Sequence, residues 1–209
     1  METRSTSGGQ RRGGRGARER ILQAAATLFY EEGIHATGVA RLVETAGVST
    51  RTFYQHFPTK TALVEEYLRG YEAGLARRIE QKLTREGLTP RDQLLALFTM
   101  VAEASSGPAG GPSNRGCPLH NAAVEAAGQM PDIRALVQGN KEGIIRQLTD
   151  IAAQAGAADP ERLGRQLAVL LEGATAMSTS LDSSRPRQDA LDAARLLIEL
   201  SLPKPQPTP

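Results

Sequence analysis

The chain has 209 residues, of which 40% are hydrophobic and only 4% aromatic, with no Trp and a net charge of +2. This length supports one large or two small domains with a real core, and the many Leu and Ala residues favour closely packed helices. The single cysteine excludes an internal disulfide and fits a reducing cytoplasm, where we expect the protein. No apolar run is long enough for a membrane span, and the basic N-terminus lacks the apolar stretch of a secretory signal.

The charge is unevenly placed along the chain. Residues 1–60 carry nine Lys and Arg against five Asp and Glu, a net charge of +4, while the remainder carries −2. Such asymmetry suggests nucleic acid as a partner of the N-terminal part only. Residues 1–16 are rich in Gly, Ser and Arg and are predicted to be a disordered basic arm. Its arginines could lie on phosphates or in a minor groove, and the alternative is a solvated tail without a role.

A first helix is predicted from Ala17 to Glu32, and Gly33 is expected to stop it. A second, short helix follows, because apolar residues recur at i, i+3, i+4 and i+7 from Val39 to Ala46. We expect the hydroxyl of Thr37 to cap this helix and Gly47 to end it in a left-handed conformation.

A third helix begins at Ser49, a good N-cap residue, and carries Phe53 and Phe57 on its inner face. Its outer face shows Thr50, Arg51, Thr52, Tyr54, Gln55 and His56. No Asp or Glu lies between Thr45 and Pro58, so nothing on this face repels phosphate. Two short helices joined by a sharp turn predict a helix-turn-helix whose second helix enters the major groove. The alternative is an αα-hairpin in a helical bundle, which the turn alone would not exclude.

A longer helix is predicted from Lys60 to about Leu83. Pro58 ends the preceding helix, and Thr59 is placed to cap the new one. The free N–H groups and positive dipole end of this helix, with Lys60 beside them, make a predicted phosphate clamp.

These segments together resemble the N-terminal part of the tetracycline-repressor (TetR) family. The resemblance rests on residues 24–29, Gly33, Thr37, residues 46–49, residues 53–57 and residues 60–63, and it covers about Arg18 to Tyr67. It implies an all-helical homodimeric transcriptional regulator, usually a repressor, whose C-terminal domain binds a small molecule. It also implies DNA contacts from Thr37, Ser49, Thr50, Arg51, Thr52, Tyr54, Gln55, His56 and Lys60. One departure is Gly38, where the family often has a phosphate-binding Thr or Ser.

The C-terminal part is predicted to be helical, for about nine helices in all. Helices are expected over 90–104, from Pro118, over 133–155, from Pro160 and over 191–200, with a flexible loop over 105–115. The predicted domains are the DNA-binding unit at 17–64, a ligand-binding and dimerisation domain at 65–202, and a Pro-rich tail at 203–209. The last two helices either complete the internal core or pair with their copies in a second subunit, as the resemblance favours.

A ligand pocket for an apolar or amphipathic effector is expected among the C-terminal helices. The residues predicted to line it are Tyr67, Tyr71, Phe98, Val101, Cys117, His120, Met130 and Ile144. Cys117 stands beside a predicted helix N-terminus and two residues after Arg115, both of which favour the thiolate. Cys117 could therefore sense electrophiles or oxidants, as some similar family members do, or could be a small buried apolar residue.

No enzyme motif is present in the sequence. There is no G-x-x-x-x-G-K-[ST] loop, no G-x-S-x-G elbow and no H-E-x-x-H. The three histidines are scattered and, with one cysteine, give no metal-site spacing. We therefore expect no catalytic activity, no metal and no cofactor. The remaining alternative to a DNA-binding regulator is a helical adaptor that has lost DNA binding.

Overall fold

The computed structural model describes residues 16–84, 87–103, 115–126 and 130–203. Over these residues it contains nine helices and no strand, which confirms the predicted all-α fold class. None of the described helices is both long and apolar enough to cross a bilayer. All but the last residue of the predicted disordered arm lies outside the described residues, as do most of the predicted loop over 105–115 and most of the Pro-rich tail.

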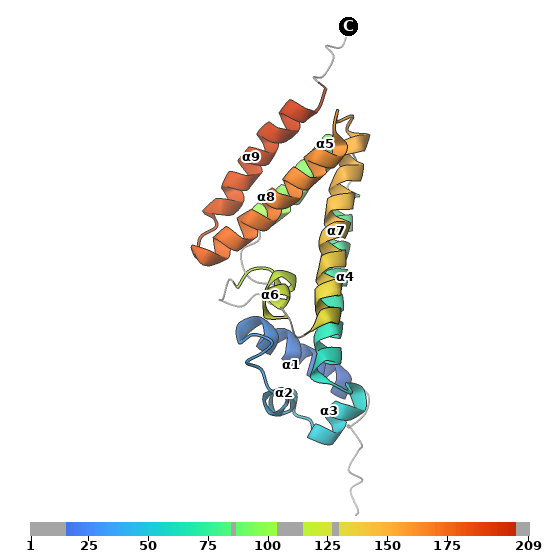
Figure 1. The fold of residues 1–209 in the computed structure, drawn as a ribbon, viewed down its shortest axis with the longest axis vertical. Coiled ribbons are helices and arrows are strands. Elements are labelled where there is room, and N and C mark those ends of the chain that lie inside the picture. The colour runs from blue at the N-terminus through green and yellow to red at the C-terminus, as the bar shows by residue number, and fades with distance from the viewer. Residues whose placement is uncertain (1–15, 85–86, 104–114, 127–129, 204–209) are drawn as a thin grey trace, which may run out of the picture. The chain divides into compact units, whose positions relative to one another are not determined.

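The chain divides into two compact units, Met1–Tyr67 and Leu68–Pro209. The first four helices are α1 (Ala17–Glu31), α2 (Val39–Ala46), α3 (Thr50–His56) and α4 (Lys60–Leu83), as Figure 1 shows. The other five are α5 (Pro90–Ala102), α6 (Pro118–Glu125), α7 (Pro131–Gln154), α8 (Pro160–Ser180) and α9 (Arg185–Ser201). Because α4 crosses the boundary, a single helix belongs to both units.

The first unit is built around the turn between α2 and α3. Gly47 adopts φ +60°, and the N–H of Val48 donates to the carbonyl of Val43 at 3.0 Å. This is the left-handed C-terminal cap predicted from the sequence, and it fixes the direction in which α3 leaves. Leu42 of α2 and Phe53 of α3 are both completely buried against α1, where Phe29 is also buried.

Thr37 does not cap α2, so that prediction is wrong. The helix begins at Val39 with Gly38 as its N-cap residue, and no side chain caps it. The Thr37 hydroxyl is instead completely buried and donates to the carbonyl of Gly33 at 2.7 Å. A buried hydroxyl needs a partner, and the turn after α1 places this carbonyl four residues back within reach.

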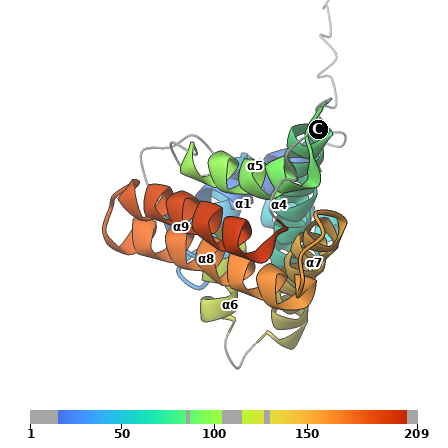
Figure 2. The ribbon, with the colours of Figure 1, turned by 90° about the horizontal axis from the view of Figure 1, so that it is seen from above.

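The second unit packs α5, α7, α8 and α9 around one core. Helices α8 and α9 lie side by side in both ribbon views (Figures 1 and 2), and α8 also packs against α7. Leu148, Leu167 and Ile198, one from each of α7, α8 and α9, are completely buried in this core. Helix α9 starts earlier than predicted, at Arg185, because Pro186 sits in its first turn, where a missing N–H is not needed.

Helices α7 and α8 approach very closely at Gly164. A Cβ added to this buried glycine would lie 2.8 Å from the backbone nitrogen of Thr149. Contacts that short require a shift of backbone, so only glycine allows this crossing of α7 and α8.

Candidate nucleic-acid interface and ligand cavity

Helix α3 is short, yet both of its ends are fixed. The side chain of Ser49 accepts a hydrogen bond from the N–H of Thr52 at 3.1 Å, which confirms the predicted N-cap. The Ser49 and Thr52 hydroxyls also pair at 2.8 Å. On the inner face, Phe53 and Phe57 are buried with ring centroids 6.2 Å apart. The cap and the two anchored rings hold α3 in one orientation.

The outer face of α3 is polar and free of acids. Thr50, Arg51, Tyr54 and Gln55 are all exposed, at positions i, i+1, i+4 and i+5. Arg51 makes no ion pair or hydrogen bond within the described part of the chain, so its guanidinium is available to a partner. This face therefore presents one cation and several hydrogen-bond donors, which is the chemistry that base edges and phosphates accept.

The start of α4 adds a second anion-binding feature. The Thr59 hydroxyl accepts from the N–H of Ala62 at 3.0 Å, so Thr59 caps the helix as predicted. Lys60 is half-buried in the first turn, where no acidic residue occurs. A positive helix end next to an ammonium group suits a phosphate.

Two arginines of α1 serve the scaffold of the first unit. Arg18 forms an ion pair with Glu66 and lies over the ring of Phe57, 5.5 Å from its centroid. Arg20 donates from Nε to the carbonyl of Ala46 at 3.0 Å, at the last residue of α2. These cations tie α1 to its neighbours, which leaves the outer face of α3 and the start of α4 as the candidate interface. Thr37 is not part of that interface, because its side chain is completely buried.

The second unit contains a partly open cavity of about 400 Å³. Its volume lies in the range of small-molecule sites. Helices α4 to α9 all contribute to its wall. The apolar lining residues are Tyr71, Leu75, Ile79, Leu97, Met100, Val101, Leu119, Ile144, Leu148 and Leu171.

Four predicted ligand residues line this cavity, namely Tyr71, Val101, Cys117 and Ile144. The structure does not bring the others to it. Phe98 is buried in the core of the second unit, because the same helical spacing also serves packing. The ring of Tyr67 packs edge-on against Phe29 within the first unit, with centroids 5.6 Å apart. Met130 is the N-cap residue of α7 and does not line this cavity. His120 lines a second, smaller cavity instead.

The charged residues of the cavity were missed in the sequence. Arg78, Lys141, Glu172 and Arg187 all line it, and Lys141 Nζ lies 2.5 Å from Glu172 Oε1. A signal for two of them does exist in the helical spacing. Lys141 stands four residues after Val137 and three before Ile144, and Arg187 stands four residues before Leu191. A charge at an apolar position of a helix face indicates either a buried ion pair or a site.

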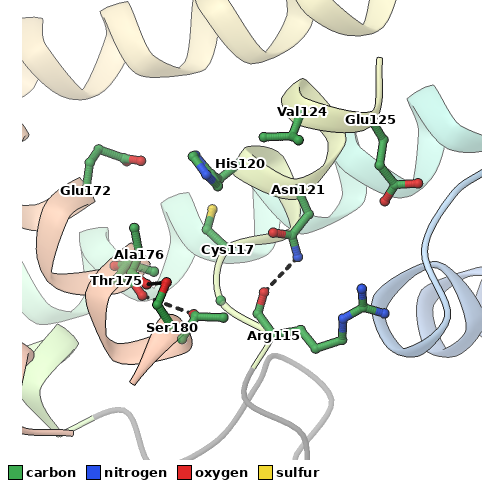
Figure 3. Close-up of a pocket in the computed structure, with 12 residues that line it drawn as sticks. Arg115, Cys117, His120, Asn121, Val124, Glu125, Glu172, Thr175, Ala176 and Ser180 are labelled. Atoms are coloured by element: carbon green, nitrogen blue, oxygen red, sulfur yellow. Dashed lines mark hydrogen bonds between the residues drawn. The ribbon is translucent and has the colours of Figure 1, made fainter. Parts of the chain in front are cut away.

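The smaller cavity, of about 340 Å³, lies beside the first and shares Gly116, Cys117, Glu172 and Thr175 with it. Figure 3 shows the sulfur of Cys117 directed to the side where His120 and Glu172 lie. Cys117 is half-buried. It is the N-cap residue of α6, in agreement with its predicted place beside a helix N-terminus. Gly116 has φ +77°, and a Cβ there would meet the Thr179 hydroxyl at 2.6 Å, so glycine is needed to place Cys117.

These features define a helix-turn-helix regulator with a separate helical domain that holds a ligand-sized cavity. Residues 21–67 match the family model for bacterial regulatory proteins of the tetR family. Residues 90–194, about half of the chain, match the tetracyclin repressor-like C-terminal domain. The chain belongs to the TetR family of transcriptional regulators. These regulators are non-enzymatic, in agreement with the catalytic motifs missing from the sequence.

Individual relatives agree with this assignment. The transcriptional repressor KstR2 of Rhodococcus jostii is 38% identical over 89 residues, 43% of this chain and 43% of that protein. The transcriptional activator FasR of Mycolicibacterium smegmatis is 36% identical over 108 residues, 48% of this chain and 49% of that protein. The match therefore spans less than half of either relative. SCO4454, a TetR-family regulator from Streptomyces coelicolor, is 26% identical with a TM-score of 0.80, over 88% of this chain and 95% of that one.

Proposed function

We propose that this protein binds a palindromic DNA operator as a homodimer, represses transcription there, and is released by a small apolar or amphipathic effector. The observation that carries the proposal is the outer face of α3. It is acid-free, exposes Arg51 beside neutral donors, and sits on a helix fixed by the Ser49 cap and the buried Phe53. Arg51 and its neighbours are proposed to read bases, while Tyr54, His56 and Lys60 hold phosphates.

A second copy of the chain is proposed from the exposed faces of α8 and α9. Apolar side chains that stay largely exposed in one chain are Val169 (71%), Met177 (53%) and Leu181 (60%) on α8, and Leu196 (63%) and Leu200 (86%) on α9. Val169, Met177 and Leu181 recur at multiples of four residues, so they form one stripe. Two copies of this helix pair would bury the stripes in a four-helix bundle. A two-fold dimer presents two copies of α3 to two half-sites.

Helix α4 offers a route for release of DNA by a ligand. Its first turn carries Lys60, and Tyr71, Leu75 and Arg78 further along it line the cavity of the second unit. A ligand that prefers one tilt of α4 changes the spacing of the two α3 helices in the dimer. It can weaken operator binding only as far as its affinities for the two states differ.

The function is tested by selecting bound duplexes from a random pool with the full chain, then repeating the selection with candidate effectors. We expect an enriched palindrome with half-sites one helical turn, or a multiple of it, apart. Recovery of unenriched sequence would instead favour the adaptor without DNA binding. A reporter gene behind the selected palindrome separates repression from activation.

A thiol-based mode of release stays a second candidate because Cys117 is half-buried and lies in the walls of both cavities. In that case modification of the sulfur takes the place of ligand binding. Operator affinity of the reduced protein and of protein treated with an electrophile decides the question. Equal affinities, or the same loss in a Cys117→Ser variant, would eliminate Cys117 as the sensor.

A further inference from the structure

The cavity of the second unit combines an apolar wall with an excess of positive charge. Three cations line it, Arg78, Lys141 and Arg187, against the single carboxylate of Glu172. They come from three different helices, α4, α7 and α9, so their meeting at one cavity results from the fold. In an apolar site such charges interact more strongly with a bound ion than they would in water.

Two of these cations occupy positions at which helix packing would favour an apolar residue. Arg187 is only 8% exposed and stands on the inner face of α9 with the buried Leu191 and Ala194. Lys141 follows the buried Val137 by one turn on the inner face of α7. Burying the charge of Arg187 costs free energy that an apolar residue would not cost, so stability alone does not favour Arg187 at this position.

The one acid in the wall already has a partner. Glu172 accepts a hydrogen bond from Lys141 Nζ at 2.5 Å, and its side chain is still 40% exposed. Beside Lys141, the Asn140 amide donates to Glu72 at 3.0 Å, while its Oδ1 is buried without a partner among the described residues. Counted over the lining residues alone, the wall carries three cations and one carboxylate, which is a net positive charge.

We propose that the effector is an amphipathic anion, with an apolar body and one carboxylate or phosphate head. The head lies near Lys141 and Arg187, and the body packs on Leu97, Val101 and Ile144. This inference rests on the proposed function, because it names the chemistry of the effector in the same cavity. The anion and Glu172 compete for Lys141, so binding loosens the contact between α7 and α8 that this ion pair makes.

Four probes with the same ten-carbon chain test the charge of the head group. They are decanoate, decyl phosphate, decan-1-ol and decyltrimethylammonium, each titrated into the full chain below its aggregation limit by calorimetry. We expect the better of the two anions to bind at least about tenfold more tightly than the alcohol, and the cation to bind more weakly than the alcohol. The relative affinity of decanoate and decyl phosphate identifies which head group the site prefers.

Two substitutions should act in opposite directions on the preferred anion. Lys141→Gln removes a cation and should weaken its binding about tenfold. Glu172→Gln removes the competing carboxylate and should strengthen it several-fold, and neither variant should change the affinity for decan-1-ol. Arg146→Gln is the matched control, because Arg146 is exposed on the same helix, pairs with Glu142 and lies outside the cavity. The side chains of Lys141 and Glu172 are partly exposed, so we expect both variants to fold. Arg187 is left unchanged, because the loss of this buried side chain could unfold the protein.

The outcomes separate this inference from the proposed function. Alcohol and anions that bind equally would overturn the anionic head while leaving an apolar effector in place. The anionic head is also contradicted if Glu172→Gln weakens the binding of the anion as much as Lys141→Gln does. If neither anion binds while an enriched palindrome is still selected from random DNA, the anion inference fails and DNA recognition stands.

Discussion

Phe53 and Tyr54 are neighbours in α3 with ring centroids 5.2 Å apart, yet Phe53 is completely buried and Tyr54 is 50% exposed. The edge of one ring packs on the other, so the buried anchor also orients the exposed phenol. The same helix thereby connects the core of the first unit to the face that carries Arg51. A substitution at buried Phe53 is therefore expected to change the position of Tyr54, which is proposed to hold a phosphate.

Replacing Arg51 by Ala should lower the affinity for the selected operator more than the affinity for random duplex. Loss of the base contact is expected to cost about 1–3 kcal/mol per half-site on the selected operator and little on random duplex. Fluorescence anisotropy on both duplexes measures the difference. Arg146→Ala, at an exposed α7 position paired with Glu142, should change neither affinity. A similar loss on both duplexes would remove Arg51 from the set of base-reading residues.

Replacing Lys60 by Ala should weaken all sequences alike. The side chain is assigned to a phosphate, so its loss removes about one counterion per chain from the release that accompanies binding. The slope of log affinity against log salt should fall in magnitude by about one for each chain bound. An unchanged slope, measured between low and physiological salt, contradicts a phosphate contact.

Ser49 allows folding and DNA binding to be separated. Asp is as good an N-cap as Ser, so Ser49→Asp should unfold near the wild-type temperature while its carboxylate repels the DNA backbone and weakens operator binding. Ser49→Ala should lose about 1 kcal/mol of stability instead. Thermal denaturation and anisotropy on both variants give the answer. Retained operator affinity in Ser49→Asp would place the start of α3 away from the DNA.

The proposed dimer predicts different effects from two matched substitutions. Val169 on α8 and Val124 on α6 are exposed to a similar extent, 71% and 64%. Val169→Glu places a charge in the proposed bundle and should shift sedimentation toward the monomer, since an unpaired buried charge is costly. Val124→Glu should leave the dimer unchanged. If both variants sediment as the wild type does, the interface lies elsewhere.

Gly164 is expected to limit the stability of the second unit. Gly164→Ala forces a methyl group against the backbone of Thr149 and should lower the free energy of unfolding by about 1–3 kcal/mol. Gly139→Ala is the control, because a Cβ at that exposed α7 position meets nothing within 4 Å and should be neutral or slightly stabilising. Equal denaturation midpoints for the two variants would show that α7 and α8 adapt to the methyl group.

The sequence predicted the local features of the first unit well. Gly47, Ser49 and Thr59 have the predicted roles, because caps depend on residues only a few positions away. The predicted capping role of Thr37 was wrong because the fold buries its hydroxyl, which donates to the carbonyl of Gly33 instead.

The cavity was harder to predict, because it depends on where six helices meet. Periodicity placed Phe98 and Val101 on one apolar face without showing that only Val101 reaches the cavity. The sequence shows Lys141 and Arg187 as charged residues at apolar positions of their helices. The spacing within either helix does not show that the two side chains line the same cavity. The cavity depends on contacts between helices that are distant in the sequence, and the spacing of residues within one helix does not predict those contacts.

The most direct test is a titration of the full chain onto the selected duplex with excess random duplex present. We expect two chains per duplex and an affinity at least about a thousandfold above that for random sequence. A single bound chain with equal affinity for both duplexes would contradict DNA recognition by a homodimer.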